Sequence, residues 1–90
     1  MSDLTGEKTK VLGRIRRMRG QMEAIERAIN EEKDCGEILH LVSSVRCAMA
    51  GLTHELIDEH LQHHVLGVDD EDERRRGVED FSSVLRSCLK

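Results

Sequence analysis

Apolar residues recur through the first third of the chain at alternating steps of four and three, a spacing that places them along one side of an α-helix. The stripe consists of Val11, Ile15, Met18, Met22, Ile25 and Ile29. Leu12 widens it by one position. The pattern predicts a helix over residues 6–32 that buries one face.

A second apolar stripe predicts a helix over residues 36–65 and keeps the helical period over about eight turns. Its members are Leu39, Val42, Val45, Met49, Leu52, Leu56 and Leu61. Long helices take most of their stability from packing against other helices. The small residues Ala48, Ala50 and Gly51 would let another helix approach this one closely.

A third helix is predicted over residues 73–89, after a loop that contains Gly67 and an acidic run over 69–73. Its short apolar face consists of Val78, Phe81, Val84, Leu85 and Cys88. No stretch alternates between apolar and polar residues as a strand would. We therefore expect an all-α fold of three helices in one domain over residues 1–90.

The composition predicts an oligomer. Ninety residues with a single aromatic side chain, Phe81, can build only a thin core, and small chains of this kind are commonly stabilised by association. The three cysteines are odd in number and widely spaced, as expected of free thiols in a reducing compartment. No apolar stretch approaches the roughly 20 residues of a membrane span, and no signal peptide is present. We expect a cytoplasmic protein that does not associate with membranes.

The net charge of −4 hides a segregation of charge along the chain. Residues 8–22 carry no acidic residue and six cations: Lys8, Lys10, Arg14, Arg16, Arg17 and Arg19. Three of these cations, Lys10, Arg14 and Arg17, form a second stripe beside the apolar one, and none has an acidic residue four positions away. Such a stripe is either a solvated face or a surface that contacts nucleic acid. The absence of acidic residues at this spacing favours the nucleic-acid contact.

His60 and His64 stand four residues apart, so a helix projects both from one face, one turn apart. Such a pair can hold a transition metal. Cys35 would be a third ligand, but a continuous helix would place it about 37 Å from His60 at 1.5 Å of rise per residue. If the three residues form one site, an antiparallel second copy must supply the cysteine. Cys35 lies at a helix start, where the helix dipole favours the thiolate.

Other readings of these residues stay open. The histidine pair could be a coincidence on a solvated face, and His63, three positions from His60, could compete as a ligand. His40 and His54 have no histidine partner at helical spacing. Cys47 and Cys88 fall near apolar stripes, where a free cysteine is usually a small buried hydrophobe. No catalytic triad, phosphate-binding loop or redox C-x-x-C motif is present, so we do not expect an enzyme.

The segment from Lys10 to Gln21, which reads KVLGRIRRMRGQ, resembles the helix 1 signature of the CsoR/RcnR family of metal-sensing repressors, a family that also contains formaldehyde and persulfide sensors. Cys35 resembles the ligand thiol of that family. The pairs at 45–46 and 51–52, the segment 55–60 and the closing pair at 89–90 also match.

This resemblance implies a three-helix protomer that forms an antiparallel four-helix-bundle dimer, assembled as a dimer of dimers. It also implies a repressor that binds double-stranded operator DNA in the apo form and releases it when an effector binds, which derepresses efflux or detoxification genes. The DNA-binding residues implied are cations of the first helix and one of the second: Lys10, Arg14, Arg16, Arg17, Arg19 and Arg46.

Within the family, the Cys35, His60 and His64 set resembles the ligands of nickel and cobalt sensors, which usually add a histidine near the N-terminus. This chain has Asp3 there, a candidate oxygen ligand. Cu(I) and Zn(II) are alternative effectors at the same site. Two other classes remain: a sensor of formaldehyde or another electrophile with Cys35 as the reactive thiol, and a metal-storage or metal-delivery protein that does not bind DNA.

Overall fold

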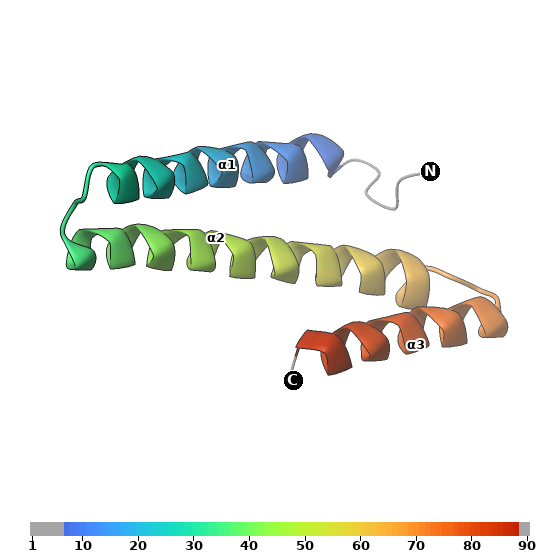
Figure 1. The fold of residues 1–90 in the computed structure, drawn as a ribbon. Coiled ribbons are helices and arrows are strands. Elements are labelled where there is room, and N and C mark those ends of the chain that lie inside the picture. The colour runs from blue at the N-terminus through green and yellow to red at the C-terminus, as the bar shows by residue number, and fades with distance from the viewer. Residues whose placement is uncertain (1–6, 89–90) are drawn as a thin grey trace. The chain divides into compact units, whose positions relative to one another are not determined.

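The computed structural model describes residues 7–88, which form three α-helices and one π-helical turn (Figure 1). Helix α1 spans Lys8–Asn30, α2 spans Cys35–Leu61, the π-helical turn η1 spans Gln62–Leu66, and α3 spans Glu71–Cys88. No strand occurs among these residues. The predicted all-α class and the three helices are confirmed. None of the described helices is long and apolar enough to cross a membrane.

Helix α1 ends two residues before the predicted position because the backbone reverses at Glu32. This residue has a φ of 55°, in the left-handed region that favours glycine. The amide of Lys33 then donates to the carbonyl of Ala28 at 2.9 Å, and the amide of Glu32 donates to that of Ile29 at 3.1 Å. A left-handed residue followed by a bond that reaches back five residues is the usual way to satisfy the last carbonyls of a helix. Here a glutamate occupies the position that glycine usually fills.

Helix α3 begins at Glu71, two residues before the predicted start, because Asp70 caps it. The Asp70 carboxylate accepts a hydrogen bond from the backbone amide of Glu73 at 2.9 Å, and the Asp70 carbonyl accepts from the amide of Arg74 at 3.0 Å. An aspartate in this role satisfies an amide that the helix itself cannot pair. The acidic run that was predicted as loop therefore supplies the helix cap and the first helical turn.

The described chain divides into two compact units, residues 7–53 and residues 54–88. In the first unit, Val11, Met18 and Ala28 of α1 and Leu52 of α2 are buried. The Gln21 side chain of α1 donates to the Ser44 hydroxyl of α2 at 3.1 Å.

The predicted α1 stripe splits into a buried half and an exposed half. Val11 and Met18 are covered, whereas Ile15, Met22 and Ile29, which recur at steps of seven, are exposed by 36%, 59% and 56%. Val42 and Met49 of α2, also seven apart, are exposed by 44% and 48%. The apolar surface is thus wider than the hairpin itself covers.

In the second unit, α3 packs on η1. Gly77, near the middle of α3, is buried, and an added Cβ atom there would overlap the carbonyl oxygen of His64. The Arg74 guanidinium donates to the carbonyl of Val65 at 3.2 Å and also to that of Val68. These contacts fasten the start of α3 to the π-helical turn and to the loop that follows it.

Candidate metal site and DNA-contact surface

His60 and His64 lie side by side where α2 passes into η1. Their ring centroids are 4.9 Å apart and the ring planes are inclined by 28°. The helix does not run unchanged to residue 65 as predicted, because the last turn, which carries His63 and His64, is π-helical. Single π-helical turns within α-helices often occur at functional sites. The two histidines are neighbours, as predicted, although the turn that carries His64 is π-helical and not α-helical.

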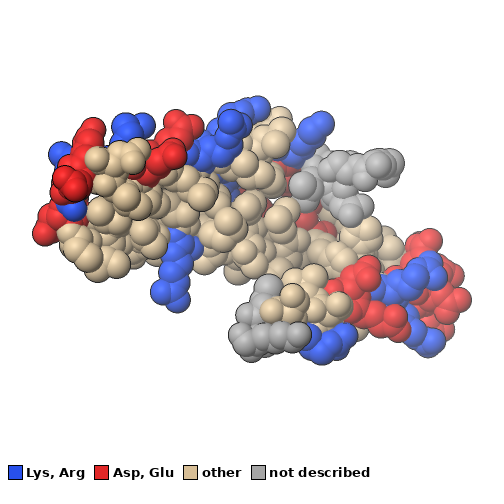
Figure 2. Space-filling model, in the orientation of Figure 1, with Lys and Arg blue, Asp and Glu red and all other residues tan. Residues whose placement is uncertain are grey.

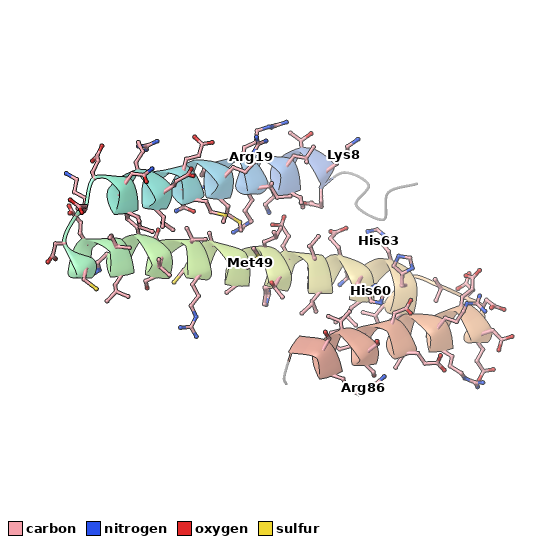
Figure 3. The ribbon with its side chains drawn as sticks, in the orientation of Figure 1. Lys8, Arg19, Met49, His60, His63 and Arg86 are labelled. Carbon is pink, nitrogen blue, oxygen red and sulfur yellow. The ribbon has the colours of Figure 1, made fainter. Side chains whose placement is uncertain are left out.

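The His60 ring is oriented by α3. Its Nε2 atom lies 2.8 Å from the carbonyl oxygen of Gly77, on the α3 side of α2 (Figure 3). A carbonyl oxygen only accepts, so Nε2 carries the hydrogen and donates it. In the neutral ring, Nδ1 then holds a free electron pair. Histidines that bind metals usually donate their other ring nitrogen to a carbonyl or carboxylate in this way.

His63 has a different neighbour. Its Nε2 atom lies 3.1 Å from Oε2 of Glu59, one helical turn earlier. The Glu59 side chain is only 16% exposed, whereas that of His63 is 44% exposed. The His63 ring lies close to this carboxylate, while His60 and His64 stack on each other. This arrangement favours the latter two as the ligand pair.

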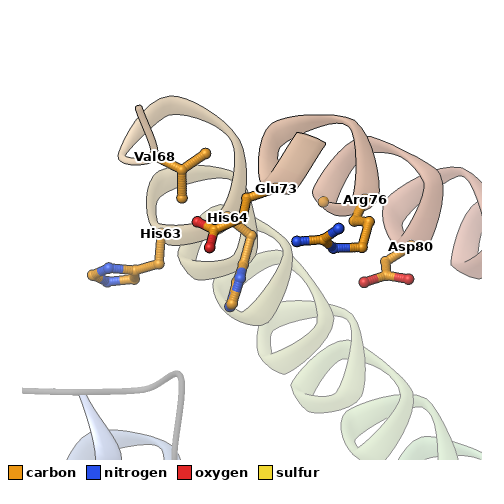
Figure 4. Close-up of a pocket in the computed structure, with 7 residues that line it drawn as sticks. His63, His64, Val68, Glu73, Arg76 and Asp80 are labelled. Carbon is orange, nitrogen blue, oxygen red and sulfur yellow. The ribbon is translucent and has the colours of Figure 1, made fainter. Parts of the chain in front are cut away.

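A hollow of about 440 Å³ opens beside His64 (Figure 4). Its walls come from η1, the following loop and α3, and they carry both signs of charge. The lining residues are His63, His64, Val68, Glu73, Arg76, Gly77 and Asp80. His64 contributes to the wall of this hollow, and its Nε2 atom is buried.

Cys35 is the first residue of α2, and its side chain is exposed. The carbonyl of Asp34 accepts from the amide of Ile38 at 3.1 Å, which makes Asp34 the residue that precedes the first helical turn. Helix α2 runs from Cys35 to Leu61, and His60 stands 25 positions after Cys35; an ideal straight helix would place two such residues about 37 Å apart. Among residues 7–88, no three His, Cys, Asp or Glu residues of one chain are placed to hold a metal ion.

Of Cys47, Cys88 and Asp3, only Cys47 has a side chain within the described part of the structure. Cys47 is exposed in the single chain, whereas a free cysteine near an apolar stripe is usually buried. The side chain of Cys88 lies outside the described part of the structure. Asp3, the candidate oxygen ligand, also lies outside it.

The cations of α1 gather over its N-terminal half, whereas acidic residues dominate towards its C-terminal end (Figure 2). Of the six cations predicted to bind DNA, five are exposed: Lys10, Arg16, Arg17, Arg19 and Arg46. Arg14 differs from them because it is half-buried. Lys10 has an acidic neighbour at a spacing of three residues: its Nζ atom lies 4.0 Å from Oε2 of Glu7.

The role of the Gly77 carbonyl was not predicted from the sequence. The sequence did contain one indication, a glycine inside a helical pattern. Such a glycine lowers helix stability by about 1 kcal/mol relative to alanine, so its presence usually has a packing reason. Only the folded chain shows that the reason is the backbone of His64.

The sequence pattern of a family described as metal-sensitive transcriptional repressors matches residues 7–87. An uncharacterised protein from the bioA 5′ region of Serratia marcescens is 34% identical, and the transcriptional repressor RcnR of Citrobacter koseri is 31% identical; both matches cover the full length of both chains. A solved structure of a variant of the formaldehyde-responsive regulator FrmR, from Salmonella enterica serovar Typhimurium, superposes with a TM-score of 0.83. It is 38% identical and covers 90% of this chain and 92% of that one.

Proposed function

Because the chain belongs to the CsoR/RcnR family of metal-sensitive transcriptional repressors, we propose that it binds operator DNA in its metal-free form and releases it on binding a transition metal. Release derepresses efflux or detoxification genes. The observation that carries the proposal is the stacked pair of His60 and His64, with the His60 ring already oriented by the Gly77 carbonyl.

The donor set fits a transition metal. One thiolate and two imidazoles suit Ni(II), Co(II), Zn(II) and Cu(I) better than Mg²⁺ or Ca²⁺, which take oxygen ligands. His60 would bind through Nδ1, because Nε2 is engaged. Cys35 must be a thiolate and both rings must be neutral. The match to nickel and cobalt sensors favours those two metals, with Asp3 as a further oxygen donor.

The thiolate comes from a second copy of the chain. Cys35 and His60 lie 25 residues apart in one helix, so an antiparallel partner is needed to bring them together. The dimer would be a four-helix bundle. The apolar side chains that recur at steps of seven and are exposed on α1 and α2 supply its surface: Ile15, Met22, Ile29, Val42 and Met49. Val78 and Val84 of α3, exposed by 45% and 48%, supply surface for joining two dimers.

Operator DNA meets the cations of α1, Arg14 among them, and Arg46 of α2. Several phosphate contacts made together give tight and strongly salt-dependent binding. Joining two copies through Cys35 and the histidine pair fixes how the copies fit together, and this moves their basic surfaces relative to each other. By thermodynamic reciprocity, operator DNA must weaken metal binding by the same factor by which metal weakens DNA binding.

Parallel DNA-release titrations test the proposal. A fluorescent duplex from the protein's own promoter region is bound at a fixed salt concentration and titrated with Ni(II), Co(II), Cu(I), Zn(II) or formaldehyde. Release by Ni(II) or Co(II), lost in His64→Ala, is expected. Failure of the metal-free protein to bind the duplex would indicate a storage or delivery protein.

A formaldehyde-responsive repressor is the second candidate. The 38% identity to a formaldehyde-responsive regulator and the exposed thiol of Cys35 favour it. In that case formaldehyde, and no metal, would release the duplex. Mass spectrometry would then show a covalent adduct on Cys35.

A further inference from the structure

Gly51 lies where the side chain of Arg14 crosses α2. A Cβ atom added at Gly51 would stand 2.6 Å from Nη1 of Arg14 and 3.5 Å from its Cζ. Non-bonded heavy atoms are ordinarily separated by about 3.5–4.0 Å. The guanidinium therefore occupies space that a side chain of any other residue type at position 51 would fill. Both residues belong to the unit of residues 7–53.

Burial separates Arg14 from its neighbours in the basic stripe. Lys10 and Arg17, one turn to either side, are exposed, whereas Arg14 is half-buried. A guanidinium is planar and more weakly hydrated than an ammonium group, so it can lie flat against a helix backbone. The same group cannot at that moment extend to a phosphate.

We propose that Gly51 is a positioning residue for Arg14: its bare backbone gives the guanidinium a resting position on α2 that competes with contact to a DNA phosphate. This inference rests on the proposed function, in which the stripe of α1 meets operator DNA. Operator binding must first withdraw Arg14 from α2, so the apparent affinity is reduced by the fraction of protein in which Arg14 is already extended.

Gly51→Ala is the direct test. The added methyl group meets the end of a flexible side chain and no backbone atom, so the fold is retained while Arg14 is displaced. The apparent Kd for the operator duplex is expected to fall about three- to tenfold, as it would if roughly a third to a tenth of the free protein held Arg14 extended. Fluorescence anisotropy at a fixed salt concentration measures this change.

Gly20→Ala is the matched control. It makes the same substitution within a helix, and a Cβ atom at Gly20 would meet nothing within 4 Å. It should leave the operator affinity unchanged. If Gly20→Ala raised the operator affinity as much as Gly51→Ala does, the effect would come from helix propensity, and the proposal would be overturned.

Arg14→Gln separates this proposal from the proposed function. In that background Gly51→Ala should bring no gain, because no guanidinium remains to be displaced; a persistent gain overturns the proposal. If Arg14→Gln weakens operator binding but Gly51→Ala alone does not strengthen it, the proposed resting position of Arg14 on α2 is refuted, whereas the proposed DNA-contact surface of α1 is retained. If Arg14→Gln leaves binding unchanged, Arg14 does not contact the duplex and this proposal fails, whereas the other assigned cations remain to be tested.

The unaltered protein offers a second measurement that does not depend on any variant folding. In the free protein, NMR should show slower hydrogen exchange at Nε–H of Arg14 than at that of Arg17, and this protection should be lost when operator duplex is added. Equal exchange rates of the two groups in the free protein would overturn the proposal.

Discussion

Gly77→Ala should weaken metal binding although Gly77 contributes no ligand atom. An added Cβ atom would overlap the His64 carbonyl oxygen and stand 2.8 Å from the carbonyl carbon, where ordinary contact needs about 3.5–4.0 Å. Because the obstacle is backbone, α3 must move away from η1 by roughly 1 Å. The 2.8 Å bond between His60 Nε2 and the Gly77 carbonyl would then lengthen beyond about 3.5 Å, where it no longer counts as a hydrogen bond.

The size of the effect follows from losing the group that orients a ligand. Removing such a partner typically lowers metal affinity about 10–100-fold, which corresponds to about 1.4–2.7 kcal/mol. The steric conflict itself costs about 1–3 kcal/mol of stability, partly offset by about 1 kcal/mol from the better helix propensity of alanine. Gly77→Ala should therefore remain folded.

Competition titrations with a chelator measure the affinities for Ni(II) and Co(II), and Gly20→Ala again serves as the control. Long-range ¹H–¹⁵N NMR of the metal-free protein should show the hydrogen of His60 on Nε2, and Gly77→Ala should convert His60 to a mixture of tautomers. An affinity equal to that of Gly20→Ala, together with an unchanged His60 tautomer, would refute the reasoning.

Three further outcomes are expected. His63→Gln should change metal affinity less than about threefold, since the His63 ring lies 3.1 Å from the Glu59 carboxylate and is not part of the ligand pair. His64→Ala, in contrast, should abolish metal-dependent DNA release. Comparable losses in the two variants would contradict the ligand assignment. Glu32→Gly should raise the free energy of unfolding by about 1 kcal/mol in urea denaturation, because it relieves a left-handed residue; an unchanged or lower stability would count against that explanation. Charge reversal of Arg14 and Arg17 together should abolish operator binding while leaving metal uptake intact, as gel shift and metal titration would show; retained binding would move the DNA surface elsewhere.

The helices were predictable because their signal is periodic and local. The apolar stripes gave the number and order of the helices, and each described boundary differs from its prediction by at most a few residues. The differences have local causes. Glu32 adopts a left-handed conformation that its residue type does not announce, and Asp70 caps α3 from within an acidic run that looked like loop.

Contacts between elements were less predictable. The spacing of His60 and His64 correctly predicted neighbours, but an ideal α-helix does not reveal that the last turn is π-helical or that Gly77 accepts from His60. The small residues of α2 were predicted to admit another helix. At Gly51 the nearest side chain is the guanidinium of Arg14. Such pairings depend on how two helices face each other, and hydrophobic spacing does not specify this.

The distance between Cys35 and His60 also bears on why this fold suits a sensor. A site contained in one chain would report only that metal is present, since filling it need not move one copy against another. Here Cys35 is the first residue of α2, whereas His60 lies in its last turn and His64 in η1. In the proposed arrangement, only two copies in one defined register complete the site, and binding energy is gained only in that register. Under the proposed function, the metal-bound state would select one packing of the dimer, and the DNA surface on α1 of each copy would move with that packing.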